Sequence, residues 1–302
     1  MTGALPFVPW SDGAAPTTGA FRMGLRPIAA EAWLPPIADL EVRLAQRRAA
    51  LAAHGRHAFA CPAASRPAAE ELCSLLDDLG VGAASRPVLA KLPGEPLLDA
   101  AARVPDDLCL LGPDEQPRLL AGVLTAPSGW RLDERLGQDL RALHAPVAGL
   151  EEAIGGRMRD FLARLPADRI FERGNWHLYD DGRYWRPSGD PLWSVPAAIR
   201  TLPEVASRLW LRCERQTLRR LPDSGWILFS IRIHCYPVTE LAAHPRLARH
   251  FRQAMASLDD AERRARRLHL VGAGLDAWLA RLPERNQGEC EGEGREADAC
   301  CR

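Results

Sequence analysis

The sequence predicts an α+β fold in which one antiparallel sheet packs against helices. The clearest strand signals are two apolar runs, Leu209–Arg220 and Trp226–Tyr236, which flank the turn-forming residues Pro222–Gly225. Segments with helical periodicity precede and follow this hairpin along the 302-residue chain. The order of the elements therefore favours a sheet with helices against a face over a parallel α/β arrangement.

The composition excludes several classes of protein. Hydrophobic residues make up 47% and charged residues 26% of the chain, as in soluble globular proteins. The formal net charge is zero, which gives no general attraction to nucleic acid or to an anionic membrane. No apolar run reaches the roughly 18 to 20 residues that span a bilayer, and the first residues lack a secretion signal. Eight cysteines without a CxxC pair indicate reduced thiols, so we expect a cytoplasmic protein.

The N-terminal third is expected to be helical after an irregular start. Residues 1–20 are rich in Gly, Pro, Ala and Thr and predict a flexible leader. Prolines keep Phe21–Pro36 extended, whereas apolar spacing predicts helices over Ile37–His54 and Ala68–Leu79. These helices open a single domain that we expect to cover residues 21–282.

The central part mixes short strands and helices. Asp107–Pro127 predicts a hairpin, because two short apolar strands flank a Gly-Pro-Asp turn. Trp130–Pro146 is expected to form a short helix and then a loop that carries His144. Glu151–Leu165 has the pattern of an amphipathic helix, and Asn175–Tyr179 that of a short strand.

The C-terminal part is predicted to be helical and then disordered. Val238–Leu258 and Asp260–Leu282 have helical periodicity. Residues 283–302 are polar and rich in glycine, which predicts a disordered tail.

Alternation along the main hairpin places polar groups on an apolar face. An even-length turn pairs Glu214 with Ile233 and Gln216 with Ile231, so that Arg212, Glu214 and Gln216 share one face. A buried carboxylate needs a partner. Two interpretations remain open: an internal Glu214–Arg212 pair, or a ligand cavity in which these three side chains are the polar contacts.

The opposite face of the same hairpin is expected to be wet. It carries Arg215, Thr217, Arg219, Ser230, Arg232 and His234. Charged and hydroxyl side chains are mostly exposed in folded proteins, which supports this expectation.

The stretch RCERQTLRRLPDSGWILFSIR resembles the strand pair of the heme-dependent oxidative N-demethylase α-subunit-like family. The stretches FRMGLRP, DDLCLL and LHAPVAG are similar to further motifs of that family, and Asn175-Trp176 falls where the family has an Asn-Trp pair. The similarity extends from about residue 21 to residue 245 and is poor after Pro245. The segment between Ala126 and Trp130 is shorter than is usual in the family.

The resemblance implies a PAS-like fold, a curved antiparallel sheet with helices packed on one face and flanking N- and C-terminal helices, which holds heme b. It also implies a heme-dependent monooxygenase that uses O2 to demethylate a small methylated amine and releases formaldehyde. Electrons would come from partner reductase subunits that carry FMN, an iron–sulfur cluster and NADPH. Two alternatives remain: a PAS-type heme sensor without turnover, and a degenerate non-heme interaction protein.

His144, in the LHAPVAG stretch, is the candidate axial ligand of the heme iron. Pro146 stiffens the segment that carries it and disfavours a helix just before it. The competing interpretation is a histidine that caps the end of the preceding helix. Other candidate ligands are His177, His234, Cys109 and Cys213.

Arg212 and Arg215 are candidates for binding the heme propionates, because guanidinium binds carboxylate in a fork. Arg131 and Arg141 are alternatives for the same role.

Four further residues have candidate roles in the reaction, and the competing interpretation is that all four pack in a structural core. Glu214 would balance the charge of a substrate ammonium or relay protons, and Gln216 would hydrogen-bond oxygen or substrate. Trp176 would offer its ring to a methylammonium, and Asn175 would orient the bound groups.

Overall fold

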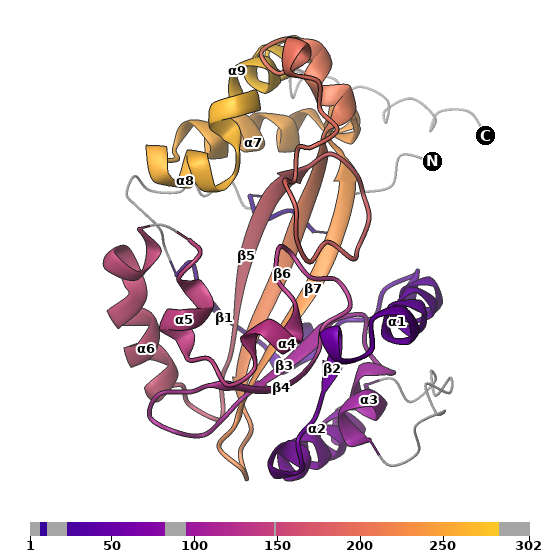
Figure 1. Ribbon diagram of the computed structural model, residues 1–302, viewed down its shortest axis with the longest axis vertical. Helices are drawn as coiled ribbons and strands as arrows, with labels where there is room; N and C mark the ends of the chain where they lie inside the picture. Colours follow the sequence, from indigo (N-terminus) through magenta and orange to yellow (C-terminus); the bar gives the residue numbers. More distant parts are fainter. Residues whose placement is uncertain (1–6, 11–22, 82–94, 148, 284–302) are drawn as a thin grey trace, which may run out of the picture.

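The computed structural model describes residues 7–10, 23–81, 95–147 and 149–283. In these residues one antiparallel sheet has the strand order β1-β5-β6-β7-β3-β4-β2, and helices surround it (Figure 1). The strands are β1 Arg26–Ile28, β2 Phe59–Ala60, β3 Asp107–Leu111, β4 Leu119–Val123, β5 Ile170–Tyr179, β6 Trp210–Arg220 and β7 Ile227–Pro237. The prediction of an α+β fold with an antiparallel sheet is confirmed.

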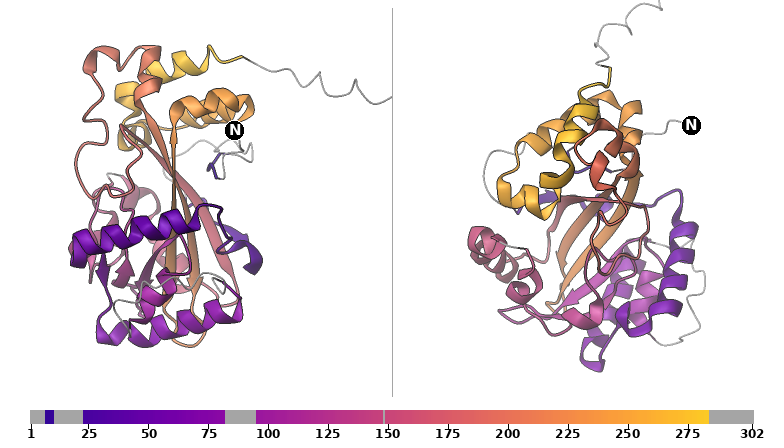
Figure 2. Two further views of the ribbon diagram at one scale, coloured as in Figure 1. Left: turned by 90° about the vertical axis from the view of Figure 1, so that its right-hand side faces the viewer. Right: turned by 45° about the horizontal axis from the view of Figure 1, so that its top comes forward.

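The helices are α1 Leu40–His54, α2 Arg66–Asp78, α3 Pro96–Ala101, α4 Leu132–Arg135, α5 Leu140–His144, α6 Gly156–Ala163, α7 Pro245–Ala256, α8 Asp260–Ala265 and α9 Leu268–Leu279. Of these, α1, α2, α4 and α6 to α9 overlap segments predicted to be helical, but three of these segments are each divided in two, and α3 and α5 were not predicted. Short helical turns are η1 Ala30–Ala32, η2 Gly55–His57, η3 Ala63–Ser65, the π-turn η4 Glu151–Gly155, η5 Ala197–Ile199, η6 Pro203–Arg208 and η7 Val238–Ala243. The helices α7 to α9 gather at one end of the long strands, and α2 and α3 at the other (Figures 1 and 2).

The register of the β6–β7 hairpin is the predicted one. The Leu221 N–H donates to the Trp226 carbonyl over 2.7 Å and closes a turn over Pro222–Gly225, an even number of residues. Glu214 therefore pairs with Ile233, and the side chains of both point to the same face of the sheet. We call this face the Glu214 face, and the other one the Arg215 face.

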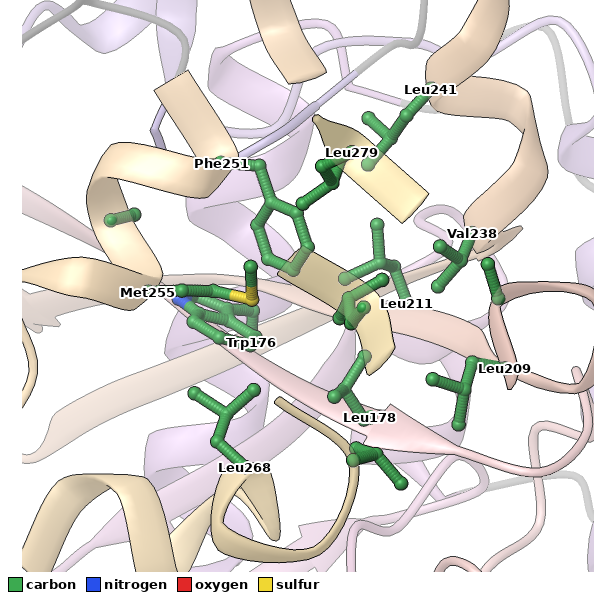
Figure 3. Packing of buried hydrophobic residues seen from close by; sticks show 14 of the residues in the cluster. Trp176, Leu178, Leu209, Leu211, Val238, Leu241, Phe251, Met255, Leu268 and Leu279 are labelled. Atoms are coloured by element: carbon green, nitrogen blue, oxygen red, sulfur yellow. The ribbon is translucent and has the colours of Figure 1, made fainter. Parts of the chain in front are cut away.

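Helices pack on both faces, so the expectation of helices on one face is corrected. On the Glu214 face, Leu132 of α4 and Leu162 of α6 join the apolar cluster that contains Ile227. On the Arg215 face, one cluster combines α2 and α3 with β3 and β4, and another combines α7 and α9 with the upper parts of β5 and β6 (Figure 3). Both faces of the sheet carry apolar side chains that must be buried, and helices pack on each face to bury them.

The Arg215 face is buried, which corrects the prediction that it is wet. Arg215 is 7% exposed, Arg232 3% and His234 6%. The segment through Trp33 crosses this face: the Arg215 guanidinium donates to the Trp33 carbonyl over 2.7 Å, and the Trp33 indole N–H donates to Thr217 over 3.1 Å.

Two ion pairs offset the cost of burying these arginines. Arg215 pairs with Glu172 on β5, and Arg232 pairs with Asp106 just before β3. The sheet thus has a charged layer at its centre and apolar clusters at both ends.

Part of the predicted leader belongs to the core. Val8 and Trp10 are 3% and 5% exposed, and the Trp10 indole donates to the Leu247 carbonyl over 3.1 Å. A Cβ at Gly174 would lie 2.6 Å from the Pro9 Cβ, so this strand position requires glycine. The flexible leader therefore does not extend over residues 7–10. The rest of it, and residues 284–302 of the predicted tail, lie outside the described residues.

Within the described ranges, each helix is too short or too polar to traverse a lipid bilayer.

Candidate functional site

The carboxylate of Glu214 lies near the middle of the sheet and is 5% exposed. Its Oε1 accepts a hydrogen bond from the Ser128 hydroxyl over 2.5 Å, and its Oε2 accepts one from the Gln216 amide over 2.7 Å. Among the described residues it forms no direct ion pair with Arg212; Ser128 stands between the two, since Arg212 Nε donates to Ser128 Oγ over 2.8 Å. The direct Glu214–Arg212 pair, one of the two interpretations left open, is thus replaced by a pair bridged through a hydroxyl.

The hydrogen-bonding capacity of Arg212 is used inside the protein. Its Nη2 donates to the carbonyls of Ala126 over 2.6 Å and Pro127 over 3.1 Å. Its guanidinium also donates to the carbonyls of Arg183 and Tyr184, both over 3.2 Å. Arg212 therefore fastens two loop segments to the sheet and has little capacity left for a ligand carboxylate.

Glu214 and His177 have shifted pKa values. Burial penalises the Glu214 carboxylate, but Arg212 and the hydrogen bonds from the Ser128 hydroxyl and the Gln216 amide favour its ionised form, and its pKa is lowered. Burial lowers the pKa of His177 to about 4, and Arg266, Arg212 and Arg173 act in the same direction. At neutral pH the site therefore holds an ionised carboxylate beside a neutral imidazole, whose Nε2 lies 3.1 Å from Asn175 Nδ2.

Two cations near Glu214 lack a carboxylate partner in the described part of the chain. Arg173 on β5 forms no ion pair there, nor does Arg266, which follows α8. The Nε atoms of both are buried without a hydrogen-bond partner. Burial lowers the pKa of both guanidinium groups, which means that their charges are poorly solvated. An anionic ligand group would offset this cost.

His144 is the last residue of α5 and bonds back to it, as the competing capping interpretation has it, whereas the main prediction places it in a loop. The Asp139 side chain accepts from the Ala142 N–H over 2.9 Å and caps the helix at its start. The His144 Nδ1 lies 2.8 Å from the Leu140 carbonyl, which only accepts, so Nδ1 carries the proton and Nε2 keeps its lone pair. Burial lowers the pKa of His144, and the charge of Arg173 acts in the same direction. The imidazole is therefore neutral and offers one nitrogen as a ligand.

The Glu214 face is incompletely covered along β5. Arg173, Asn175 and His177 are half-buried, whereas Trp176 and Leu178 on the Arg215 face are buried. Apolar side chains on the same face are also half-buried and line its lower part; these are Phe171, Leu218 and Phe229. The face thus combines accessible apolar surface with convergent polar groups, as ligand sites do.

The chain matches the model of a known protein family. The model described as "Haem-dependent oxidative N-demethylase, alpha subunit-like" matches residues 82–273. The chain belongs to this family. The match includes β3 to β7 and α3 to α8, among them the long strands that carry the Glu214 face and the helices α4 to α6 that cover it.

The family match has different limits from the expected ones. It continues to residue 273, beyond Pro245, where the sequence resemblance is poor. It starts at residue 82, so the FRMGLRP stretch lies outside it. Arg266 therefore falls within the matched region, although no sequence pattern assigns it to the site.

The described residues fit the heme that the family name implies. A heme needs an axial donor, an apolar surface and cations for its propionates. His144 offers a neutral nitrogen, the half-buried face beside α5 offers apolar surface, and Arg173 and Arg266 offer cations without carboxylate partners.

The structure does not bring all predicted site residues together. His144, Arg212, Glu214, Gln216 and Asn175 belong to the Glu214 face or to the helices above it.

Trp176 and Arg215 point to the other side of the sheet. The Trp176 ring is 6% exposed and packs against Phe251 at a centroid distance of 5.1 Å (Figure 3). It also packs against Trp10 at 5.9 Å. It also lies under Arg266, whose Cζ is 5.2 Å from the ring centroid. The Trp176 ring is therefore buried among core side chains and offers no free face to a methylammonium.

Sequence reasoning missed Ser128, Arg173 and Arg266. Ser128 lies in a short Pro-Ser-Gly loop without any motif, so only its contacts identify it. Arg173 precedes the predicted strand start at Asn175, although alternation from Asn175 places it on the same face. Arg266 lies in the arginine-rich stretch AERRARR, whose charged residues have the pattern of a solvated helix.

Proposed function

We propose that this protein binds heme b against the Glu214 face, with His144 Nε2 as the axial ligand, and demethylates a small methylated amine oxidatively. The observation that carries the proposal is the hydrogen bond from His144 Nδ1 to the Leu140 carbonyl, 2.8 Å long. It fixes the tautomer and orientation that an iron-ligating histidine needs. The curved sheet and its helices would then form a PAS-like heme domain, which remains a prediction of the family resemblance.

Heme, when bound, supplies the oxygen and electron chemistry that oxidises an N-methyl group. The residues of this chain bind and orient the reactants. Arg173 and Arg266 lie beside Asn175 and His177 on the accessible stretch of β5 and would hold the two propionates. Arg212 and Arg215 are less suited to this task, because both guanidinium groups are occupied by internal partners.

Glu214 is the counter-charge for the protonated amine in this proposal. Its lowered pKa keeps it ionised at neutral pH, and a buried carboxylate attracts an ammonium group strongly. The Gln216 amide nitrogen is occupied by Glu214, which leaves its carbonyl oxygen to accept a hydrogen bond from the amine. The neutral His177 would neither repel the ammonium nor compete for the carboxylate as a cation.

Electrons would come from separate subunits, consistent with the words "alpha subunit" in the family description. We propose reductase partners that carry FMN, an iron–sulfur cluster and NADPH.

Reconstitution tests the proposal. The full chain is incubated with hemin and passed over a gel-filtration column, and its visible spectrum is recorded. We expect a retained Soret band that His144→Ala changes or abolishes and that added imidazole restores. His269→Ala on the exposed face of α9 is the matched control and should leave the spectrum unchanged. A chain that retains no heme would refute the proposal and favour a non-heme interaction protein.

Turnover distinguishes the enzyme from a sensor. The heme-loaded chain is supplied with a reductase, NADPH and dimethylamine, and formaldehyde is measured. Formaldehyde formation that depends on Glu214 supports the proposal. Reversible oxygen binding without formaldehyde across a panel of methylated amines would favour the sensor.

A further inference from the structure

The loop residue Ser128 connects the two charged groups at the centre of the Glu214 face. It lies between β4 and α4, in the segment that runs from Ala126 to Trp130. Its hydroxyl oxygen is 2.8 Å from Arg212 Nε and 2.5 Å from Glu214 Oε1.

The hydrogen bonds that link Arg212, Ser128 and Glu214 can point in one direction only. A guanidinium has N–H donors and no acceptor, so Arg212 donates and the Ser128 oxygen accepts. The single proton of the Ser128 hydroxyl is then directed to Glu214 Oε1, while Gln216 donates to the other oxygen. Both carboxylate oxygens thus receive a hydrogen bond, and hydrogen bonds to the ionised form favour that form.

The protein also fixes Ser128 from behind. The Gly129 N–H donates to the Arg186 carbonyl over 2.7 Å, and Ser128 bridges to Arg186 as a short parallel pair. Arg186 is itself held by ion pairs with Asp180 at 3.0 Å and Asp181 at 2.6 Å. These contacts hold the Ser128 backbone in place, and the two hydrogen bonds of the hydroxyl set the position of its side chain.

We propose that Ser128 is a positioning residue, which keeps the Glu214 carboxylate ionised and oriented for the amine. The link to the amine rests on the proposed function; the control of the carboxylate does not. Other charged and titratable groups also act on Glu214: Arg173, His177 and Tyr179 on β5, Arg212 and Cys213 on β6, and Arg266. They remain in place when only the hydroxyl is removed, so Ser128→Ala isolates its effect.

The first measurement needs neither heme nor substrate. Infrared spectra of the full chain are recorded as a function of pH, and the band of the protonated Glu214 carboxyl is assigned by its loss in Glu214→Gln. Loss of one hydrogen bond to a charged group should raise the titration midpoint in Ser128→Ala by about one to two pH units. Ser128→Thr keeps the hydroxyl and should restore the wild-type midpoint.

A control variant and one decisive result complete this measurement. Ser207→Ala removes a hydroxyl that bonds only to the Glu204 carbonyl of its own turn, and it should leave the midpoint unchanged. Equal midpoints in wild type and in a folded Ser128→Ala variant would overturn the proposal.

The second measurement addresses the amine. Dimethylamine binding is followed by the visible spectrum of the heme-loaded chain and measured as a function of pH. The pH at which binding is lost on acidification should be higher in Ser128→Ala and equal to the wild-type value in Ser128→Thr. A chain that shows the infrared shift but binds no heme refutes the proposed function and leaves the role of Ser128 in place. If the wild-type chain forms formaldehyde but Ser128→Ala leaves the infrared midpoint unchanged, the role of Ser128 is refuted and the proposed function stands.

Discussion

The ion pair of Asp106 and Arg232 gives the sharpest stability prediction. Asp106 is 0% exposed and Arg232 3%, and one carboxylate oxygen accepts from both Nε at 2.9 Å and Nη2 at 2.7 Å. The remaining arm of Arg232 donates to the Pro35 carbonyl over 2.9 Å. Asp106→Asn therefore leaves a buried guanidinium without its counter-charge.

The expected loss follows from this burial. Removing one partner of a buried ion pair costs about 3–5 kcal/mol, because the other charge stays desolvated. For a chain of this size that corresponds to a fall in Tm of roughly 6–10 °C. Replacing Arg232 by Met should cost a similar amount, whereas the double variant should lose much less than the sum of the two single variants.

Urea denaturation of the full chain and of the three variants measures these terms. Asp160→Asn is the matched control, because Asp160 pairs with Arg164 on the surface and both side chains are more than half exposed. This control should cause no measurable loss. A loss below about 1 kcal/mol for Asp106→Asn, or additive losses in the double variant, would refute the buried pair.

Two further predictions follow from the cationic and imidazole groups. Replacing Arg173 and Arg266 together by Gln should weaken heme retention at least tenfold, because two charge-assisted contacts to the propionates are lost. Retention is measured by the transfer of heme to apomyoglobin. Unchanged retention would contradict the proposed role of both arginines. Burial and Arg232 lower the pKa of His234 to about 3, below the unfolded value of about 6.5. Between these two values acidification protonates His234 in the unfolded state but not in the folded state. The free energy of unfolding therefore falls by up to ~1.4 kcal/mol per pH unit. His234→Phe should flatten this acid-side loss in urea midpoints measured against pH, and an unchanged slope would contradict it.

The hairpin was predictable because its information is local. Alternation determines which side chains of one strand share a face, and an even-length turn determines which residues of the next strand point to that same face. The register that pairs Glu214 with Ile233 needs only the sequence around Pro222–Gly225, and it is confirmed. The N-terminal signal of α5 was also present, since Asp139 is a good helix cap, but Pro146 dominated the interpretation.

The burial of the Arg215 face could not be predicted from the same pattern. A row of Arg, Thr and Ser has the same alternation whether water or another segment covers it. What covers it is the stretch through Trp33, about 180 positions away in the chain, and the carboxylates that neutralise it come from β5 and from the residue before β3. Long-range partners of this kind leave no periodicity in the sequence.

The same reasoning explains why the sequence points to Arg212 and Arg215 as propionate ligands, whereas the contacts lead us to propose Arg173 and Arg266. In a chain with a single lysine and many arginines, position on a strand says which face a guanidinium occupies, but not whether its donors are used. Arg212 is satisfied by backbone carbonyls, whereas Arg173 on the neighbouring strand has a buried Nε without a partner. Unused donors, rather than the presence of arginine, distinguish a ligand-binding cation from a structural one, and this difference is visible only once the loops have been placed.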